Sequence, residues 1–138
     1  MEPEREETTM NKEKICVVQE HHAAHLHWDL RLEMNGLLKS WAIPKEPPRE
    51  VGIKRLAIPV EDHPIDYASF SGTLPEGQYG AGEVIIWDKG TYKIISIQEN
   101  KMVIIIYGEK LQGEYCLIKT KFQGKENWLL FKTKNLNK

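Results

Sequence analysis

A histidine, an aspartate and an arginine occur at alternate positions in the stretch His27-Trp28-Asp29-Leu30-Arg31. Successive side chains of an extended strand point to opposite faces, so these three polar side chains share one face. The Cα atoms of His27 and Asp29 then lie roughly 6.5–7 Å apart, and both side chains can reach one divalent cation. The guanidinium beside them suits two oxygens of a phosphate. The spacing predicts metal-assisted chemistry on a phosphate, with a solvated, mixed-charge strand face as the simpler alternative.

The turn that follows fixes which residues face this strand. Asn35-Gly36 is typical of a two-residue hairpin turn, because both residues tolerate a positive φ. This turn predicts a return strand in which Ser40 lies opposite Arg31 and Ala42 opposite Asp29. On the other face the large apolar side chains oppose one another: Trp28 with Ile43, and Leu30 with Trp41. The polar face is therefore predicted to have small neighbours and room for a ligand, in a register that a slip of one residue would reverse.

Four more histidines lie outside this stretch, at positions 21, 22, 25 and 63. A histidine-rich tract is a compositional indication of metal binding. His21 enters the strand from the preceding segment and is the candidate third metal ligand. His22 and His25 are predicted to be surface residues or to lie behind the ligands. His63 follows a predicted strand, in the loop-like sequence Glu61-Asp62-His63-Pro64.

Several separate motifs, in order, resemble the 3′-phosphoesterase module of bacterial DNA ligase D. They include LHWDLRLE at 26–33, EDHP at 61–64 and PEGQYGAG at 75–82. The remaining matches are Gln19, His21, Ala24, Gly36, Tyr67 and the stretches 38–45 and 55–57. The resemblance covers about residues 15–134, and we expect a free-standing form of the module, without an attached ligase or polymerase.

The resemblance implies a Mn²⁺-dependent enzyme, with Zn²⁺ or Co²⁺ as other possible ions, that acts on 3′ ends of DNA or RNA-tipped primer–templates. It would remove a terminal ribonucleotide and then the 3′-phosphate, leaving a 3′-hydroxyl for a ligase in non-homologous end joining. By resemblance, the metal ligands are His21, His27 and Asp29, and the groups that hold the scissile phosphate are Arg31, His63 and Tyr67. Supporting positions are Gln19, Lys45, Arg55 and Glu61.

This chain departs from the family pattern at two places. The family usually has a basic residue before the Leu-His pair, where this chain has His25, which weakens the expected contact with a DNA backbone. The family also uses an arginine upstream of the core. Only Arg5 is available for it here, and the intervening spacer is short.

Composition limits the class of protein. The chain has 138 residues and a formal net charge of −1, which predicts one domain and excludes attachment to nucleic acid by bulk charge. Cys16 and Cys116 are a hundred positions apart and are predicted to be buried free thiols. With no signal peptide or membrane span, we expect a cytoplasmic monomer that works with a separate DNA ligase and polymerase.

The pattern along the chain predicts a mainly β, antiparallel, single-domain barrel with short flanking helical segments. We expect a flexible arm at 1–14, the barrel at 15–134 and a tail at 135–138. Strands are predicted near 15–18, 26–33, 37–43, 55–60, 83–88, 91–97, 101–107, 114–120 and 127–133. A turn or helical fragment is expected at 21–25 and a helical turn near Asp66. The glycines of 77–82 precede a strand, so we interpret them as turn and bulge positions rather than a phosphate-binding loop.

Two rival functions are compatible with the same residues. His27, Asp29 and a distant His63 form the two-histidine, one-carboxylate set of non-haem iron oxygenases, which often use β-barrels. That interpretation leaves Arg31 and Tyr67 without a role. The other rival is a non-catalytic module that binds DNA ends, for which metal ligands would be unnecessary.

Overall fold

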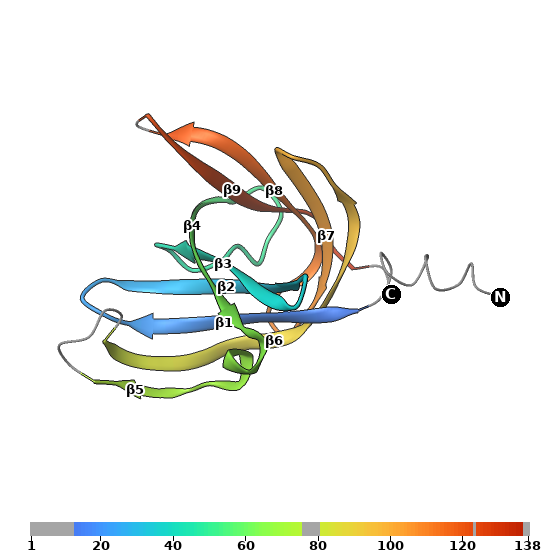
Figure 1. Cartoon of the computed structure of the whole chain (residues 1–138). Helices are drawn as coiled ribbons and strands as arrows, with labels where there is room; N and C mark the ends of the chain where they lie inside the picture. The colour runs from blue at the N-terminus through green and yellow to red at the C-terminus, as the bar shows by residue number, and fades with distance from the viewer. Residues whose placement is uncertain (1–12, 76–80, 123, 137–138) are drawn as a thin grey trace.

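The computed structural model describes residues 13–75, 81–122 and 124–136. These residues form nine strands and one short 3₁₀ helix (Figure 1). The strands are β1 (Lys14–His22), β2 (Leu26–Met34), β3 (Leu37–Ile43), β4 (Lys54–Pro64), β5 (Gly72–Leu74), β6 (Gly82–Ile97), β7 (Lys101–Tyr107), β8 (Gln112–Phe122) and β9 (Lys125–Lys134), and the helix η1 is Ile65–Ser69.

The strands pair antiparallel in the order β1-β2-β3-β4-β9-β8-β7-β6-β5. A further pairing of β1 with β6 closes eight of them into a barrel and leaves β5 on the free side of the first part of β6. The predicted antiparallel β-barrel with little helix is thus confirmed. Strand β1 begins at Lys14, next to the predicted start of the barrel at residue 15.

The β2–β3 hairpin has the predicted register. Arg31 lies opposite Ser40 and Asp29 opposite Ala42. The turn residues Asn35 and Gly36 have φ angles of 52° and 82°, as a two-residue turn of this kind requires. One face of the hairpin is therefore apolar and the other carries the polar residues.

The apolar face lines the barrel interior. Leu30, Leu32 and Trp41 are fully buried there, together with side chains from every other wall of the barrel. The opposite face is also covered near one end, where Val17 and Leu38 pack against Ala68 of η1. The sheet of β1, β2 and β3 thus lies between two apolar clusters, and burial on both faces fixes its register strongly.

The sequence prediction was wrong at Lys89-Gly90, which we expected to separate two strands. Instead β6 runs unbroken through these residues, and Gly90 lies opposite Cys16 of β1. A Cβ at Gly90 would stand 2.2 Å from the carbonyl oxygen of Tyr107. The glycine therefore marks a close approach of β6 to the end of β7, where a side chain would collide, rather than a turn.

The predicted bend at 21–25 is shorter than expected, because His21 and His22 belong to β1 and only residues 23–25 turn. Of the glycine-rich stretch 77–82, residues 77–80 lie outside the described residues, as do Arg5 and most of the predicted arm. Gly82 starts a strand, in agreement with the turn and bulge interpretation, and a Cβ there would meet the His22 carbonyl oxygen at 2.2 Å.

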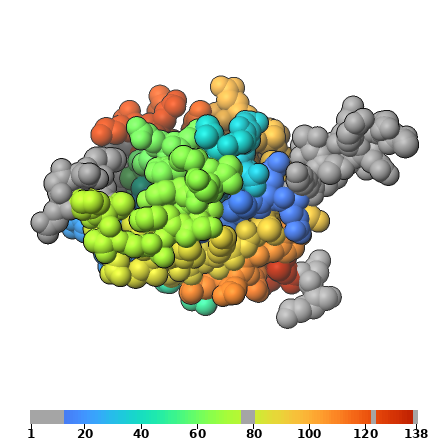
Figure 2. All heavy atoms as spheres, turned by 60° about the horizontal axis from the view of Figure 1, so that its bottom comes forward, coloured from blue at the N-terminus to red at the C-terminus, as the bar shows by residue number. Residues whose placement is uncertain are grey.

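Strand β4 changes its surroundings halfway along. Its pairing with β9 ends at Ala57, whereas its pairing with β3 continues to Pro64. Pro59 therefore lies on a free edge, as predicted, where its missing N–H costs no ladder bond. The chain then forms η1, the helical turn predicted near Asp66, and continues into β5. Figure 2 shows this green β4–η1–β5 segment spread over one side of the molecule, above the yellow atoms of β6.

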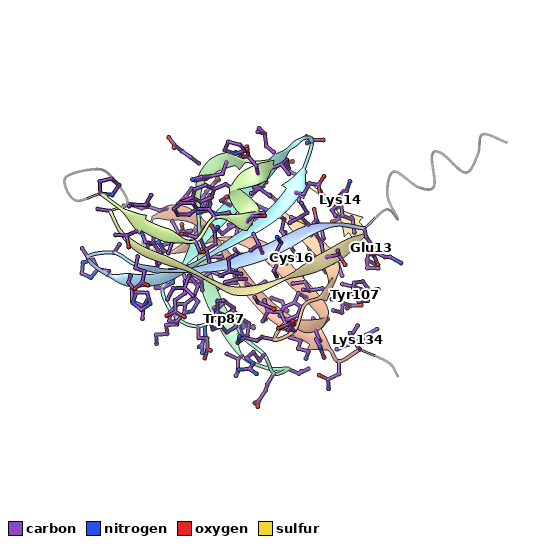
Figure 3. All side chains as sticks on the ribbon, turned by 90° about the horizontal axis from the view of Figure 1, so that it is seen from below. Glu13, Lys14, Cys16, Trp87, Tyr107 and Lys134 are labelled. Carbon is purple, nitrogen blue, oxygen red and sulfur yellow. The ribbon has the colours of Figure 1, made fainter. Side chains whose placement is uncertain are left out.

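Lys14 and Lys134 lie at the same end of the barrel in Figure 3, away from the β1–β2 turn. Cys16 and Cys116 are buried free thiols, as predicted. Among the described residues, no helix has the length and apolar character needed to span a bilayer.

Candidate active site

The polar face of β1 and β2 brings the predicted metal ligands together. His21 on β1 lies directly opposite His27 on β2, and Gln19 lies opposite Asp29. Alternation along each strand places all four side chains on the same face. Asp29 and His21 are buried, and His27 is partly exposed.

The ligand atoms of His21, His27 and Asp29 lie within 4.8 Å of one another. The Asp29 Oδ2 atom is 3.3 Å from His27 Nε2 and 3.7 Å from His21 Nδ1. Two ligands about 2.1 Å from one ion stand roughly 3.0–3.4 Å apart in octahedral or tetrahedral geometry. The two distances from Asp29 are close to this range, so the three groups can share one divalent cation once their side chains draw together.

The ring of His27 is oriented for this role by its other nitrogen. Its Nδ1 lies 3.0 Å from the carbonyl oxygen of His25. An Nδ1–H donated to that carbonyl leaves the Nε2 lone pair facing Asp29, which is the usual arrangement behind a metal-bound histidine. The hydrogen bond to Asp29 raises the pKa of His27, so a metal ion competes with a proton for this nitrogen.

Arg31 is buried beside this cluster and held by several partners. Its Nε donates to Gln19 Oε1 at 2.6 Å, and its Nη1 donates to Ser40 Oγ at 2.8 Å. A longer contact of 3.4 Å joins Nη2 to Asp29 Oδ2. Burial lowers the pKa of Arg31, but a guanidinium remains charged at neutral pH. A fixed positive charge therefore stands next to the candidate metal site.

His63 reaches the same place because β4 contains a bulge. Val60 pairs with Ser40, but Leu38 pairs with His63, so β4 has one residue more than β3 between these pairs. Regular alternation from Val60 would have put Asp62 on this face, and the extra residue puts His63 there instead. His63 was expected in a loop and lies in the strand, with its Nδ1 3.1 Å from Arg31 Nη1.

Tyr67 of η1 covers the arginine. The Arg31 Cζ atom is 5.1 Å from the centre of the Tyr67 ring, and the His63 ring centre is 4.7 Å from it. Phe70 also stacks on Tyr67, with ring centres 5.0 Å apart and planes at 12°. Burial raises the pKa of Tyr67, so its hydroxyl keeps its proton and can donate it to an oxygen.

Gln19 connects Arg31 of β2 with the backbone of Tyr67 and Phe70. Its Oε1 accepts from Arg31, and its Nε2 donates to the carbonyl oxygens of Tyr67 at 2.8 Å and Phe70 at 3.2 Å. One fully buried amide thereby ties β2 to the backbone of η1.

These side chains surround a cavity of about 410 Å³. Its polar lining consists of His21, His25, His27, Asp29, Arg31, Glu61, His63 and Tyr67, and its apolar lining consists of Ala23, Ala24, Ala42, Val60, Leu74 and Val84. Arg31 is the one permanent cation among these described lining residues. The arrangement can hold a cation and an anion side by side, as metal-assisted phosphoryl chemistry requires.

The structure does not bring two of the predicted site residues to this cavity. Lys45 is exposed after β3. Arg55 lies on the Ala57 parity of β4, which faces the barrel interior, and its Nε donates to the carbonyl oxygen of Glu46 at 2.7 Å. Glu61 does line the cavity, and its carbonyl oxygen is 3.1 Å from His63 Nδ1. Roles for Lys45 and Arg55 stay predictions from the resemblance.

Two supporting residues were missed by sequence reasoning. Ser40 was taken only as a small neighbour of Arg31, although the hairpin register already placed its hydroxyl within reach. Phe70 had no signal, because its stacking on Tyr67 depends on the path of η1.

The iron-oxygenase set was predicted with His63 as its second histidine. In the structure His21 completes the cluster with His27 and Asp29, while His63 contacts Arg31. The proposed grouping of His63 with the ligands is therefore wrong.

Comparison with known proteins decides the family. The sequence model described as the DNA ligase D 3′-phosphoesterase domain matches residues 19–119. The chain belongs to the DNA ligase D 3′-phosphoesterase family. All of the site residues named above lie within the matched stretch.

Similar proteins include several named multifunctional non-homologous end joining protein LigD. The Pseudomonas aeruginosa protein is 47% identical over 128 residues, covering 88% of this chain and 15% of that protein. The Mycolicibacterium smegmatis protein is 44% identical over 138 residues, covering 92% of this chain and 18% of that protein. A Mycobacterium tuberculosis protein, named multifunctional non-homologous end joining DNA repair protein LigD, is 44% identical over 123 residues, covering 86% of this chain and 16% of that protein. The chain thus spans less than a fifth of the length of these relatives.

Proposed function

We propose that this member of the 3′-phosphoesterase family is a divalent-metal-dependent enzyme that heals 3′ ends of DNA. It removes a 3′-phosphate, or a terminal ribonucleoside followed by the phosphate, and leaves a 3′-hydroxyl that a ligase can seal. The observation that carries the proposal is the cluster of His21, His27 and Asp29 beside the Arg31–His63 pair in one cavity.

His21, His27 and Asp29 would hold the ion, with Mn²⁺ as the proposed cofactor and Zn²⁺ or Co²⁺ as substitutes. Mixed imidazole and carboxylate ligands accept all three ions, so the ligand types do not choose among them. When bound, such an ion polarises a phosphate oxygen and lowers the pKa of a bound water.

Arg31 positions the phosphate. Its Nε–H and both Nη1–H groups are directed at Gln19, Ser40 and His63, and one Nη2–H is directed at Asp29. Within the described part of the chain, the second Nη2–H has no protein partner, so it is available to a phosphate oxygen. Because its other donors are held, the guanidinium requires little rearrangement as charge develops on the phosphate.

His63 is the proposed donor of a proton to the leaving oxygen. In the free protein, burial and the neighbouring Arg31 lower its pKa, so it is neutral at pH 7. A bound phosphate offsets the charge of Arg31 and favours protonation, and the imidazolium can then give a proton to the leaving oxygen. Tyr67 donates its hydroxyl hydrogen to a further phosphate oxygen. For the ribonucleoside step, the 2′-hydroxyl of the substrate takes part, so an all-deoxy terminus is not resected.

Two histidines and one carboxylate also form the ligand set of iron oxygenases. The Arg31–His63 pair beside them, and the family to which the chain belongs, favour phosphoryl chemistry. The proposed setting is end joining, with DNA ends as substrate and a ligase and a polymerase as partners.

The test is a primer–template with a 3′-phosphate, incubated with Mn²⁺ and analysed for release of inorganic phosphate and formation of a 3′-hydroxyl. The proposal requires product, and a matched primer with a terminal ribonucleotide should be shortened by one residue. End binding that survives a chelator without any product would instead indicate a non-catalytic module. Oxygen consumption with Fe²⁺ and a 2-oxo acid would indicate the oxygenase.

A further inference from the structure

Two apolar side chains, Ala42 and Val60, line the cavity on its β3–β4 side. Ile58 of β4 lies opposite Ala42, and we call Ala42, Ile58 and Val60 the apolar ledge. Ala42 lies between Asp29 of β2 and Ile58 of β4. In the next row, Ser40 lies between Arg31 and Val60. Two strand spacings, roughly 10 Å, therefore separate the ledge residues of β4 from Asp29 and Arg31 of β2.

The fold does not require these side chains to be apolar. Ile58 and Val60 are each 37% exposed and belong to neither hydrophobic cluster. They lie beyond Ala57, where β4 has lost β9 as a neighbour. Natural proteins usually place charged side chains on such free edges, because charges prevent pairing with other chains. The two aliphatic side chains are therefore free to contact a ligand.

The volume of the cavity is larger than a phosphate group requires. Ala42 and Val60 line it together with Asp29 and Arg31, so the ledge continues the phosphate site. Its volume of about 410 Å³ lies in the range that accepts a small organic molecule, whereas a phosphate group has only five heavy atoms. The apolar lining of the cavity includes Ala42 and Val60 of the ledge, together with Ala23, Ala24, Leu74 and Val84.

We propose that the apolar ledge binds the sugar and base of the nucleoside that carries the scissile phosphate, and that it does so without selecting the base. This inference rests on the proposed phosphoesterase function. Base edges are distinguished by hydrogen-bonding side chains such as Asn, Gln and Arg, and the ledge has none. Aliphatic side chains contact a sugar or the face of any base, which suits an enzyme that must process ends of every sequence.

The experiment compares two double variants with the wild-type chain. Ile58→Thr/Val60→Thr makes the ledge polar and shortens it by one methyl group at position 58, and Ile95→Thr/Ile97→Thr makes the same kind of change on β6. Ile95 and Ile97 are each 49% exposed and do not line the cavity. With Mn²⁺ present, KM is measured for four 3′-phosphate primer–templates that differ only in the terminal base pair. The inhibition constant of inorganic phosphate is measured in parallel.

We expect wild-type KM values within about threefold of one another. The ledge variant should raise all four by about fivefold or more, through loss of apolar contact, and change phosphate inhibition by less than about twofold. The β6 variant should change neither. If the ledge variant melts early, Val60→Ala provides the same comparison with a smaller effect.

An unchanged KM in the ledge variant would overturn the inference, and so would equal changes in KM and phosphate inhibition or a preference for one base above about tenfold. Those results do not concern turnover by the wild-type chain, so they would not contradict the proposed function. Absence of phosphate release from every substrate by the wild-type chain would instead refute the proposed function, and the ledge inference with it.

Discussion

Arg31 Nη1 and the carbonyl oxygen of Glu61 compete for one atom, the Nδ1 of His63, and each lies 3.1 Å from it. A guanidinium only donates and a carbonyl only accepts. Nδ1 therefore accepts from Arg31 when it carries a lone pair and donates to Glu61 when it carries a proton. The two contacts therefore belong to two states of Nδ1, without and with a proton, and a phosphate that engages Arg31 favours the second.

The lowered pKa of His63 predicts a pH dependence of stability. Its folded-state pKa lies below the unfolded value of about 6.5, so the unfolded chain takes up this proton first as the pH falls. Stability is then lost from about pH 6.5 down to the folded-state pKa. In metal-free protein, His63→Gln should lose less free energy of unfolding between pH 7.5 and 5.5 than the wild-type chain, as followed by urea denaturation. An equal or larger loss in the variant would contradict the sign.

Substituting Arg31 by lysine tests the geometry of the positive charge. Lysine keeps the charge but cannot reach Gln19, Ser40 and a phosphate oxygen at once. Arg31→Lys should reduce kcat for 3′-phosphate release by about 10²–10³-fold, while the circular dichroism spectrum is retained. Lys39→Arg, a change on the opposite parity of β3, serves as the control. Activity within a few fold of wild type in Arg31→Lys would show that charge alone suffices.

Gln19 and Gln112 allow a matched comparison of two amides. Gln19 is fully buried with three partners, whereas Gln112 is exposed and donates once, to Gly108, at 3.0 Å. Loss of the buried amide leaves polar groups of β2 and η1 without partners, so Gln19→Ala should lower the free energy of unfolding by about 2 kcal/mol. Gln112→Ala should lower it by less than about 0.5 kcal/mol. Equal effects would mean that Gln19 does not fasten η1 to the sheet.

Local alternation and turn chemistry explain how much of the site was predictable. The parity of His27, Asp29 and Arg31, and the turn at Asn35-Gly36, determined one face and one register, and both are present in the structure. Burial of apolar clusters on the two sides of this sheet makes that register the stable one. These are properties of a few neighbouring residues, so the sequence shows them directly.

The remaining parts depend on contacts between distant segments. The bulge that brings His63 to Arg31 adds one residue to β4 relative to β3, and alternation within β4 gives no sign of it. Gly90 looks like a turn signal until Tyr107 is known to lie against it. The exclusion of Arg55 from the cavity likewise follows from the parity that β4 takes against β9. In each case the neighbouring strand decides.

The most direct measurement of the central claim is a titration of the chain with Mn²⁺, followed by electron paramagnetic resonance of the free ion. The wild-type chain should bind one ion, Asp29→Asn and His27→Gln should lose that site, and His22→Gln should keep it. His22 is the control because it is exposed and contacts Glu20 at 2.6 Å. Unchanged binding in Asp29→Asn and His27→Gln, or loss of the site in His22→Gln alone, would contradict a metal centre built from His21, His27 and Asp29.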